Sequence, residues 1–282
     1  MSNLEVRRIP FDFEDVPFMW NPEQPRFSMM MNQLTFVTIG FERYICKAIR
    51  AAETEISDPE VATEARLFRE QEAVHAVAHT KHVKGLVAQY PGLQSSLDKV
   101  VKFYDDLFEE HPLEFHLAYV GGTEAIFTPF FKMILDNRAT LFAGGDERVS
   151  SLFMWHFCEE VEHRSSAITI YNHVVGKYWY RLTNTRKFLG LSGSLFELMA
   201  EEFKKHVPNI PEAAFEGSPF DSVPRIDKLR SSMGILGAQV PWHKPVNQAV
   251  PDYYAEWMAH WNAGEDVTRL YGQPAQELKK VS

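Results

Sequence analysis

WHFCEEVEHR, residues 155–164, forms the centre of a predicted helix that carries three metal-binding side chains on one face. At roughly 100° per residue, His156, Glu160 and His163 fall within an arc of about 60°, one turn apart along the helix axis. Glu159 also lies within about 60° of both histidines. Helical geometry therefore predicts a metal-binding face, but it leaves open which of the two glutamates belongs to that face.

A second Glu-x-x-His motif lies upstream, in the segment REQEAVHAVAH. There Glu72 and His75 have the same spacing as Glu160 and His163. The segment belongs to a predicted helix over residues 59–90, which the sequence Ser-Asp-Pro-Glu opens and Pro-Gly ends. Two such motifs on two long helices predict a site between the helices.

Two further histidines, His79 and His82, follow on the same face as His75. Each is either a supporting partner of the metal site or a structural or solvated side chain. The structural or solvated role is the more common one for a histidine on such a helix. A zinc-protease reading of His75 and His79 fails, because the glutamate of that motif must directly follow the first histidine. Here that position is Ala76.

Two isolated glutamates lie on the apolar faces of two other predicted helices, over residues 26–53 and 113–136. Glu42 shares its face with Leu34 and Ile45, and taken alone it would most simply pair with a nearby arginine. Glu124 lies on a stripe of large apolar side chains, where an unpaired carboxylate would cost several kcal/mol. Both carboxylates therefore need a partner.

The complete set is similar to that of ferritin-like di-iron and di-manganese carboxylate proteins, in which two glutamates and two Glu-x-x-His motifs project into a helical bundle. The two glutamates precede the motif glutamates by 30 and 36 residues. Carboxylates offset the charge of two divalent ions, and imidazoles complete the coordination. The resemblance implies an all-α, ferritin-like four-helix bundle with two metal ions, iron being expected and manganese or a manganese–iron pair being alternatives. Its ligands would be Glu42, Glu72, His75, Glu124, Glu160 and His163.

A closer resemblance covers about residues 6–180. The segments VRRIPFDFEDVP, EQEAVH and EEVEHR resemble bacterial proteins labelled predicted metal-dependent hydrolases. The order His-x-x-x-Glu-x-x-His is also similar to that of p-aminobenzoate N-oxygenases, di-iron enzymes in which a third histidine binds the cluster. That resemblance implies His156 as a seventh ligand, and the family pattern favours Glu160 over Glu159. It covers little beyond the metal motifs, so an arylamine substrate does not follow.

Composition excludes several other functions. The net charge of −9 and the lack of clustered Lys and Arg argue against nucleic acid as a partner. No apolar run of about 18 residues occurs, and MSNLEVRRIP lacks the apolar core of a signal peptide, so we expect a cytoplasmic protein without a membrane span. The two cysteines, Cys46 and Cys158, predict neither a disulfide framework nor a Cys-x-x-Cys site.

Three regions are expected along the chain. Prolines among aromatic residues predict an extended N-terminal arm over residues 1–25. The bundle follows over residues 26–207 and includes one helix from Asp146 to Gly176 and another from Tyr178 to about His206. Half of the 16 prolines lie from Pro208 onward, so residues 208–282 are expected to be an irregular cover on the bundle, with one aromatic helix at about residues 253–261.

The predicted function is a non-haem dimetal enzyme that activates dioxygen to oxidise a small organic or lipid-like substrate. An electron donor and a homodimer are compatible with this function. One alternative is a metal-dependent hydrolase in which two metals share a bound hydroxide. Another is a ferroxidase or iron-binding protein, and the last is a structural bundle without metal.

Overall fold

The protein is all-α over the residues that the structure, a computed structural model, describes: 4–240 and 242–273. This part of the chain contains no β-strand, apart from one isolated bridge between Asp146 and Gln273. The predicted fold class is confirmed. The α-helices are α1 (Pro25–Ala52), α2 (Pro59–Gln89), α3 (Leu93–Glu110), α4 (Leu113–Asp136), α5 (Arg138–Leu141), α6 (Glu147–Glu162), α7 (Ser166–Val174), α8 (Tyr178–His206), α9 (Arg225–Ala238) and α10 (Asp252–Asn262). Short 3-10 helices cover Glu53–Glu55, Glu212–Ala214, Pro245–Asn247 and Val267–Arg269.

Aspartate caps set the starts of two of the site-bearing helices. The side chain of Asp58 accepts hydrogen bonds from the first-turn N–H groups of α2, and Pro59 follows at the first helical position. Asp146 caps α6 in the same way and also forms a buried ion pair with Arg148 at 2.8 Å. These local interactions fix where each helix begins, and with it the direction in which its glutamate and histidine side chains point.

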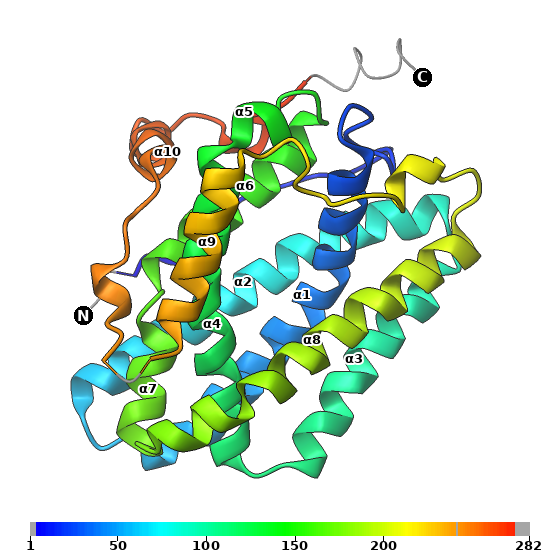
Figure 1. The fold of residues 1–282 in the computed structure, drawn as a ribbon. Coiled ribbons are helices and arrows are strands. Elements are labelled where there is room, and N and C mark those ends of the chain that lie inside the picture. The colour runs from blue at the N-terminus through cyan, green and yellow to red at the C-terminus, as the bar shows by residue number, and fades with distance from the viewer. Residues whose placement is uncertain (1–3, 241, 274–282) are drawn as a thin grey trace.

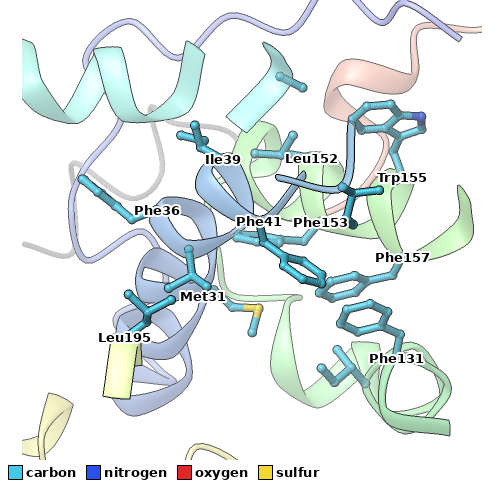
Figure 2. Close-up of a cluster of buried hydrophobic side chains, with 14 of the residues drawn as sticks. Met31, Phe36, Ile39, Phe41, Phe131, Leu152, Phe153, Trp155, Phe157 and Leu195 are labelled. Atoms are coloured by element: carbon cyan, nitrogen blue, oxygen red, sulfur yellow. The ribbon is translucent and has the colours of Figure 1, made fainter. Parts of the chain in front are cut away.

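Four helices form a closed ring, because α1 contacts α2, α2 contacts α6, α6 contacts α4 and α4 contacts α1 (Figure 1). α3 and α8 pack outside this ring against α1 and against each other. Large apolar side chains from α1, α4 and α6 belong to one buried core, with Leu195 of α8 among them (Figure 2). Within that core Phe131 of α4 stacks on Phe157 of α6 with ring centroids 4.1 Å apart. The apolar packing holds the four helices at fixed distances from one another.

The helix predicted to run unbroken from Asp146 to Gly176 is instead two helices. α6 ends at Glu162, and α7 begins at Ser166 after a turn in which the Ser166 N–H donates to the His163 carbonyl. The Ser166 hydroxyl also donates to Glu64 of α2, so the turn is tied to a neighbouring helix inside the protein. A side-chain bond to another helix can outweigh the helical continuity that the local sequence favours.

Extended segments flank the helices at both ends. The N-terminal arm crosses α2 at Gly85, where a Cβ atom would lie 2.4 Å from the Phe13 carbonyl oxygen. Only glycine allows this close approach. Residues 1–3 of the predicted arm, and Pro241 and residues 274–282 of the predicted C-terminal cover, lie outside the described residues. Among the described residues, no helix combines the length and apolar character needed to cross a bilayer.

The C-terminal region holds a helix that the sequence did not predict, α9, in a segment expected to be irregular. α9 packs on α4, where Gly234 lies against Pro129: a Cβ atom on Gly234 would come within 2.7 Å of the proline Cβ. The second C-terminal helix, α10, agrees with the predicted aromatic helix within one residue at each end. Both helices lie on the outside of the four-helix ring (Figure 1).

Candidate metal centre

The four helices of the ring each contribute to one buried cluster. α1 carries Glu42, α2 carries Glu72 and His75, α4 carries Glu124, and α6 carries His156 and Glu160. His163 is the first residue after α6, so its backbone is released from the helix while its side chain still points into the ring. All seven residues singled out from the sequence therefore meet at one place.

The cluster consists of two overlapping groups of four side chains, and in each group the donor atoms lie within 4.8 Å of one another. His75 and Glu160 belong to both groups. The first group adds Glu42 and His156, and the second adds Glu72 and His163. Glu124 lies beside the second group, with its Oε2 3.4 Å from Nδ1 of His163. Two groups that share members are the arrangement expected of two adjacent metal ions with common ligands.

The cluster is buried, and its unpaired polar atoms destabilise the protein as long as no metal ion is bound. Each of the seven residues is at most 3% exposed. Several of their nitrogen and oxygen atoms have no hydrogen-bond partner. A buried polar atom without a partner costs about 1–3 kcal/mol of folding stability. The unpartnered atoms are Glu42 Oε2, both carboxylate oxygens of Glu72 and of Glu124, Glu160 Oε2, His75 Nδ1 and both ring nitrogens of His163. Oxygen and nitrogen donors of this kind suit divalent iron, manganese or zinc, so the residues present fit two metal ions.

Electrostatics lead to the same interpretation. Burial raises the pKa of Glu42 to about 8. Burial alone would lower the pKa of His156, but hydrogen bonds to Glu160 and Glu42 outweigh it and raise that pKa to about 10. Burial also opposes a charged His163, yet the neighbouring carboxylates Glu160 and Glu124 raise its pKa to about 9. Without metal, protons therefore take the place of the positive charge that the carboxylates require.

Glu159 and Glu160 have different environments, which the helical pattern could not resolve. Glu160 accepts a hydrogen bond from His156 Nε2 at 2.9 Å and faces the cluster. Glu159 faces the outside of the ring, where Arg7 donates to its Oε1 at 3.0 Å. Its other oxygen accepts a hydrogen bond from His75 Nε2 at 2.8 Å. This bond fixes His75 in the tautomer that leaves Nδ1 directed at the cluster.

Arg7 is a site residue that sequence reasoning missed, because it lies in the arm to which no chemistry was assigned. Its guanidinium is 3% exposed and pairs with both Glu159 and Glu162, in each case at about 3 Å. Trp257 and Trp261 of α10 lie over it, with ring centroids 5.5 and 5.9 Å from the guanidinium carbon. An arginine followed by a second arginine in a proline-rich arm gives no local signal of this role.

His79 and His82 are not solvated, because both are fully buried. His79 Nε2 lies 2.8 Å from His156 Nδ1, and its Nδ1 lies 3.1 Å from the Thr35 hydroxyl. The same hydroxyl lies 3.2 Å from Nδ1 of His82. If His156 were to hold a metal ion through Nε2, its Nδ1–H would donate to His79, His79 would donate to Thr35, and Thr35 would donate to His82. This chain of hydrogen bonds holds the His156 ring in one orientation.

Two cavities flank the cluster. One, of about 440 Å³, lies between α4 and α9; no cluster residue lines it, but Thr128, one helical turn after Glu124, does. Its lining is mostly apolar, and the Thr128 hydroxyl has no hydrogen-bond partner. The other, of about 580 Å³, opens at the turn between α6 and α7 and is lined by Glu162 and Arg164, the neighbours of His163. Each is large enough for a small organic molecule.

Comparison with known proteins adds one finding. A family model described as "Predicted metal-dependent hydrolase" matches residues 5–207, which include the arm, all seven cluster residues and Arg7. No curated protein and no solved structure matches the chain.

Proposed function

Because the chain belongs to the family of predicted metal-dependent hydrolases and brings seven Glu and His side chains into one buried cluster, we propose that it is an enzyme with two metal ions. The observation that carries the proposal is the set of unpartnered donor atoms that face one another without solvent. The proposed ligands are Glu42, Glu72, His75, Glu124, His156, Glu160 and His163.

Two reactions are candidates for such a centre. Bound metal ions supply Lewis-acid activation of water for hydrolysis, or electrons for the reduction of dioxygen. The family description supports hydrolysis. We propose dioxygen activation as the reaction. The argument for it is that dioxygen is small and apolar enough to enter a cluster whose members are at most 3% exposed, whereas hydrolysis needs the carbonyl group of the substrate itself to reach a metal ion.

The residues around the cluster serve either reaction by holding its members in place. Glu159 keeps His75 in one tautomer, and His79 does the same for His156. The aromatic rings of Phe68 and Trp155, next to His163 and His75, exclude water from the cluster. We propose the mostly apolar cavity beside Thr128 as the place of an organic substrate, and a ferritin-like relationship as the origin of the four-helix ring.

The test begins with the metal content of the purified protein and of protein reconstituted anaerobically with ferrous iron or with zinc. We expect about two ions per chain. The reduced iron form should consume dioxygen and change its visible spectrum on exposure to air, and the zinc form should do neither. Turnover of an ester panel by the zinc form without dioxygen would establish hydrolysis instead. A metal content near zero under all conditions would refute the metal centre.

Metal binding is expected to release protons. At pH 7 the raised pKa values of Glu42, His156 and His163 mean that all three carry protons in the metal-free protein. The metal ligands must lose these protons before they bind. The affinity for metal ions should therefore increase as the pH rises from 6 toward 9 and fall at lower pH. Calorimetric titration at pH 7 in two buffers of different ionisation enthalpy measures the protons released. We expect more than one per chain, and identical heats in both buffers would contradict the assignment.

His156→Ala is expected to keep both metal ions but change the reaction with dioxygen. Six proposed ligands remain in this variant, while one nitrogen donor and the contact with His79 are lost. We expect full metal content and at least a roughly tenfold change in the rate of oxygen consumption, the range seen when donor environments are altered. Stopped-flow mixing with oxygenated buffer measures the rate. An unchanged rate would remove His156 from the proposed ligands.

A further inference from the structure

One side of α9 exposes a stripe of large apolar side chains. Ile226, Leu229, Met233 and Leu236 are 51, 57, 63 and 68% exposed. At roughly 100° per residue they fall within an arc of about 80° on the helix surface. The opposite side of α9 packs on α4 through Gly234. The stripe therefore has no partner among the described residues, and an exposed apolar stripe of this kind indicates an interaction surface.

Two exposed tryptophans lie close to the C-terminal end of α9. Trp242, just after the helix, is 77% exposed, and Trp179 on α8 is 70% exposed. α8 and α9 are joined at this point, because the Tyr178 hydroxyl donates to the Gln239 carbonyl at 2.7 Å. Both helices cross the front of the molecule in the view of Figure 1. We call this surface, formed by residues 177–195, 225–240 and 242–246, the α8–α9 face.

The charge of the α8–α9 face is opposite to that of the whole chain. The chain has a net charge of −9, yet residues 177–195 contain four Lys and Arg and no Asp or Glu; of the four, Arg181 is buried and Lys177 pairs with Glu114. Residues 225–246 contain four Lys and Arg and one acid, Asp227. By helical position, Arg225 and Arg230 lie on the two sides of the apolar stripe, and both are exposed. Arg230 pairs with Asp227 at 3.2 Å, an exposed contact that leaves the guanidinium accessible.

We propose that the α8–α9 face binds peripherally to the surface of an anionic lipid bilayer. The apolar stripe and the two exposed tryptophans enter the boundary between headgroups and acyl chains, and the flanking cations lie at the anionic headgroups. A second copy of this chain fits the face less well, because a symmetric contact would place its cations against the same cations of the partner. Arg230 also lines the cavity beside Thr128, but no residue of the face belongs to the metal cluster, so the proposal does not depend on which reaction the cluster performs.

Flotation of the full-length protein with vesicles tests the proposal. Phosphatidylcholine vesicles containing phosphatidylserine should bind the protein, and phosphatidylcholine alone should bind it more weakly. The triple variant Leu229→Gln/Met233→Gln/Leu236→Gln, and separately the double variant Arg225→Glu/Arg230→Glu, should each reduce binding by at least roughly tenfold. All five side chains are exposed, so folding should be unaffected, and circular dichroism checks this.

Matched controls lie on other surfaces. Val77→Gln alters an apolar side chain of α2 that is 59% exposed, and Arg43→Glu/Arg50→Glu changes the net charge as much as the α9 double variant does. Both controls should bind vesicles like the wild type. As a second measurement, lipids with spin labels near the headgroup should quench tryptophan fluorescence, and Trp179→Phe/Trp242→Phe should abolish most of this quenching.

Absence of binding to the phosphatidylserine vesicles would overturn the proposal. Equal loss of binding in the controls and the α9 variants would do the same. If instead sedimentation shows a dimer that the triple variant dissociates, and vesicles do not bind, the face is an interface between two copies of the chain.

Discussion

Glu160→Ala is expected to lose at least one of the two metal ions and to abolish activity. Glu160 belongs to both groups of donor atoms, and its carboxylate lies between His156, His75 and His163 at 2.9, 3.7 and 3.6 Å. Its removal deletes a donor from each group and leaves positive charge without a counter-ion. We expect a metal content below about one ion per chain and a reduction in activity of at least roughly 10³-fold, measured by elemental analysis and by oxygen consumption.

Glu160→Gln keeps the volume of the side chain and removes its charge, so it should show the same metal loss without a cavity. Glu159→Ala is the matched control on the neighbouring position. It should keep two ions, although with weaker affinity, because His75 loses the carboxylate that orients it. Full metal content in Glu160→Ala beside metal loss in Glu159→Ala would show that the other glutamate is the ligand.

Arg7→Ala is expected to destabilise the protein by about 3–5 kcal/mol, the cost of leaving buried charges without their partner. The guanidinium is the cation beside both Glu159 and Glu162, whose side chains are 0% and 6% exposed. The variant also removes the contacts with Trp257 and Trp261. Chemical denaturation of the metal-free protein measures the loss of unfolding free energy. The variant should also bind metal ions more weakly, because His75 is held less firmly.

Arg8→Ala is the control, because Arg8 is the adjacent residue and is exposed. It should change the unfolding free energy by less than about 0.5 kcal/mol. Arg7→Lys keeps a positive charge but cannot donate to two carboxylates in a fork, so its stability should lie between those of the wild type and Arg7→Ala. If Arg7→Ala has the same free energy of unfolding as the wild type, Arg7 does not stabilise the protein through Glu159 and Glu162.

Most residues of the cluster could be predicted from helical periodicity, whereas the choice of Glu160 over Glu159 and the inclusion of His156 as a ligand came from resemblance to known families. Glu42 and Glu124 stand out as carboxylates on apolar faces, and the Glu-x-x-His spacing places each motif on one side of its helix. Helix ends with strong local signals were also predicted well, as at Asp58 and Asp146, whose side chains cap α2 and α6. Such features depend on residues that are close in sequence, so a single sequence is enough to predict them.

The features that were missed depend on contacts between distant parts of the chain. The turn after Glu162 is held by Ser166 and Glu64, which are 102 residues apart. Arg7 and Glu159 are 152 residues apart, and no pattern in either segment identifies the other. α9 was missed although its large apolar side chains have helical spacing, because the prolines of this region favoured irregular backbone and because it packs on α4 through small residues while the large apolar side chains remain exposed. Tertiary packing decides these features, and local propensity does not.

The contacts of Arg7 also bear on the order in which the fold can be assembled. Arg7 contacts Glu159, Glu162 and Trp257, and the last of these lies 250 residues downstream of it. During synthesis the complete set of contacts can therefore form only after residue 257 has left the ribosome, whereas α1 and α2 are available to each other much earlier.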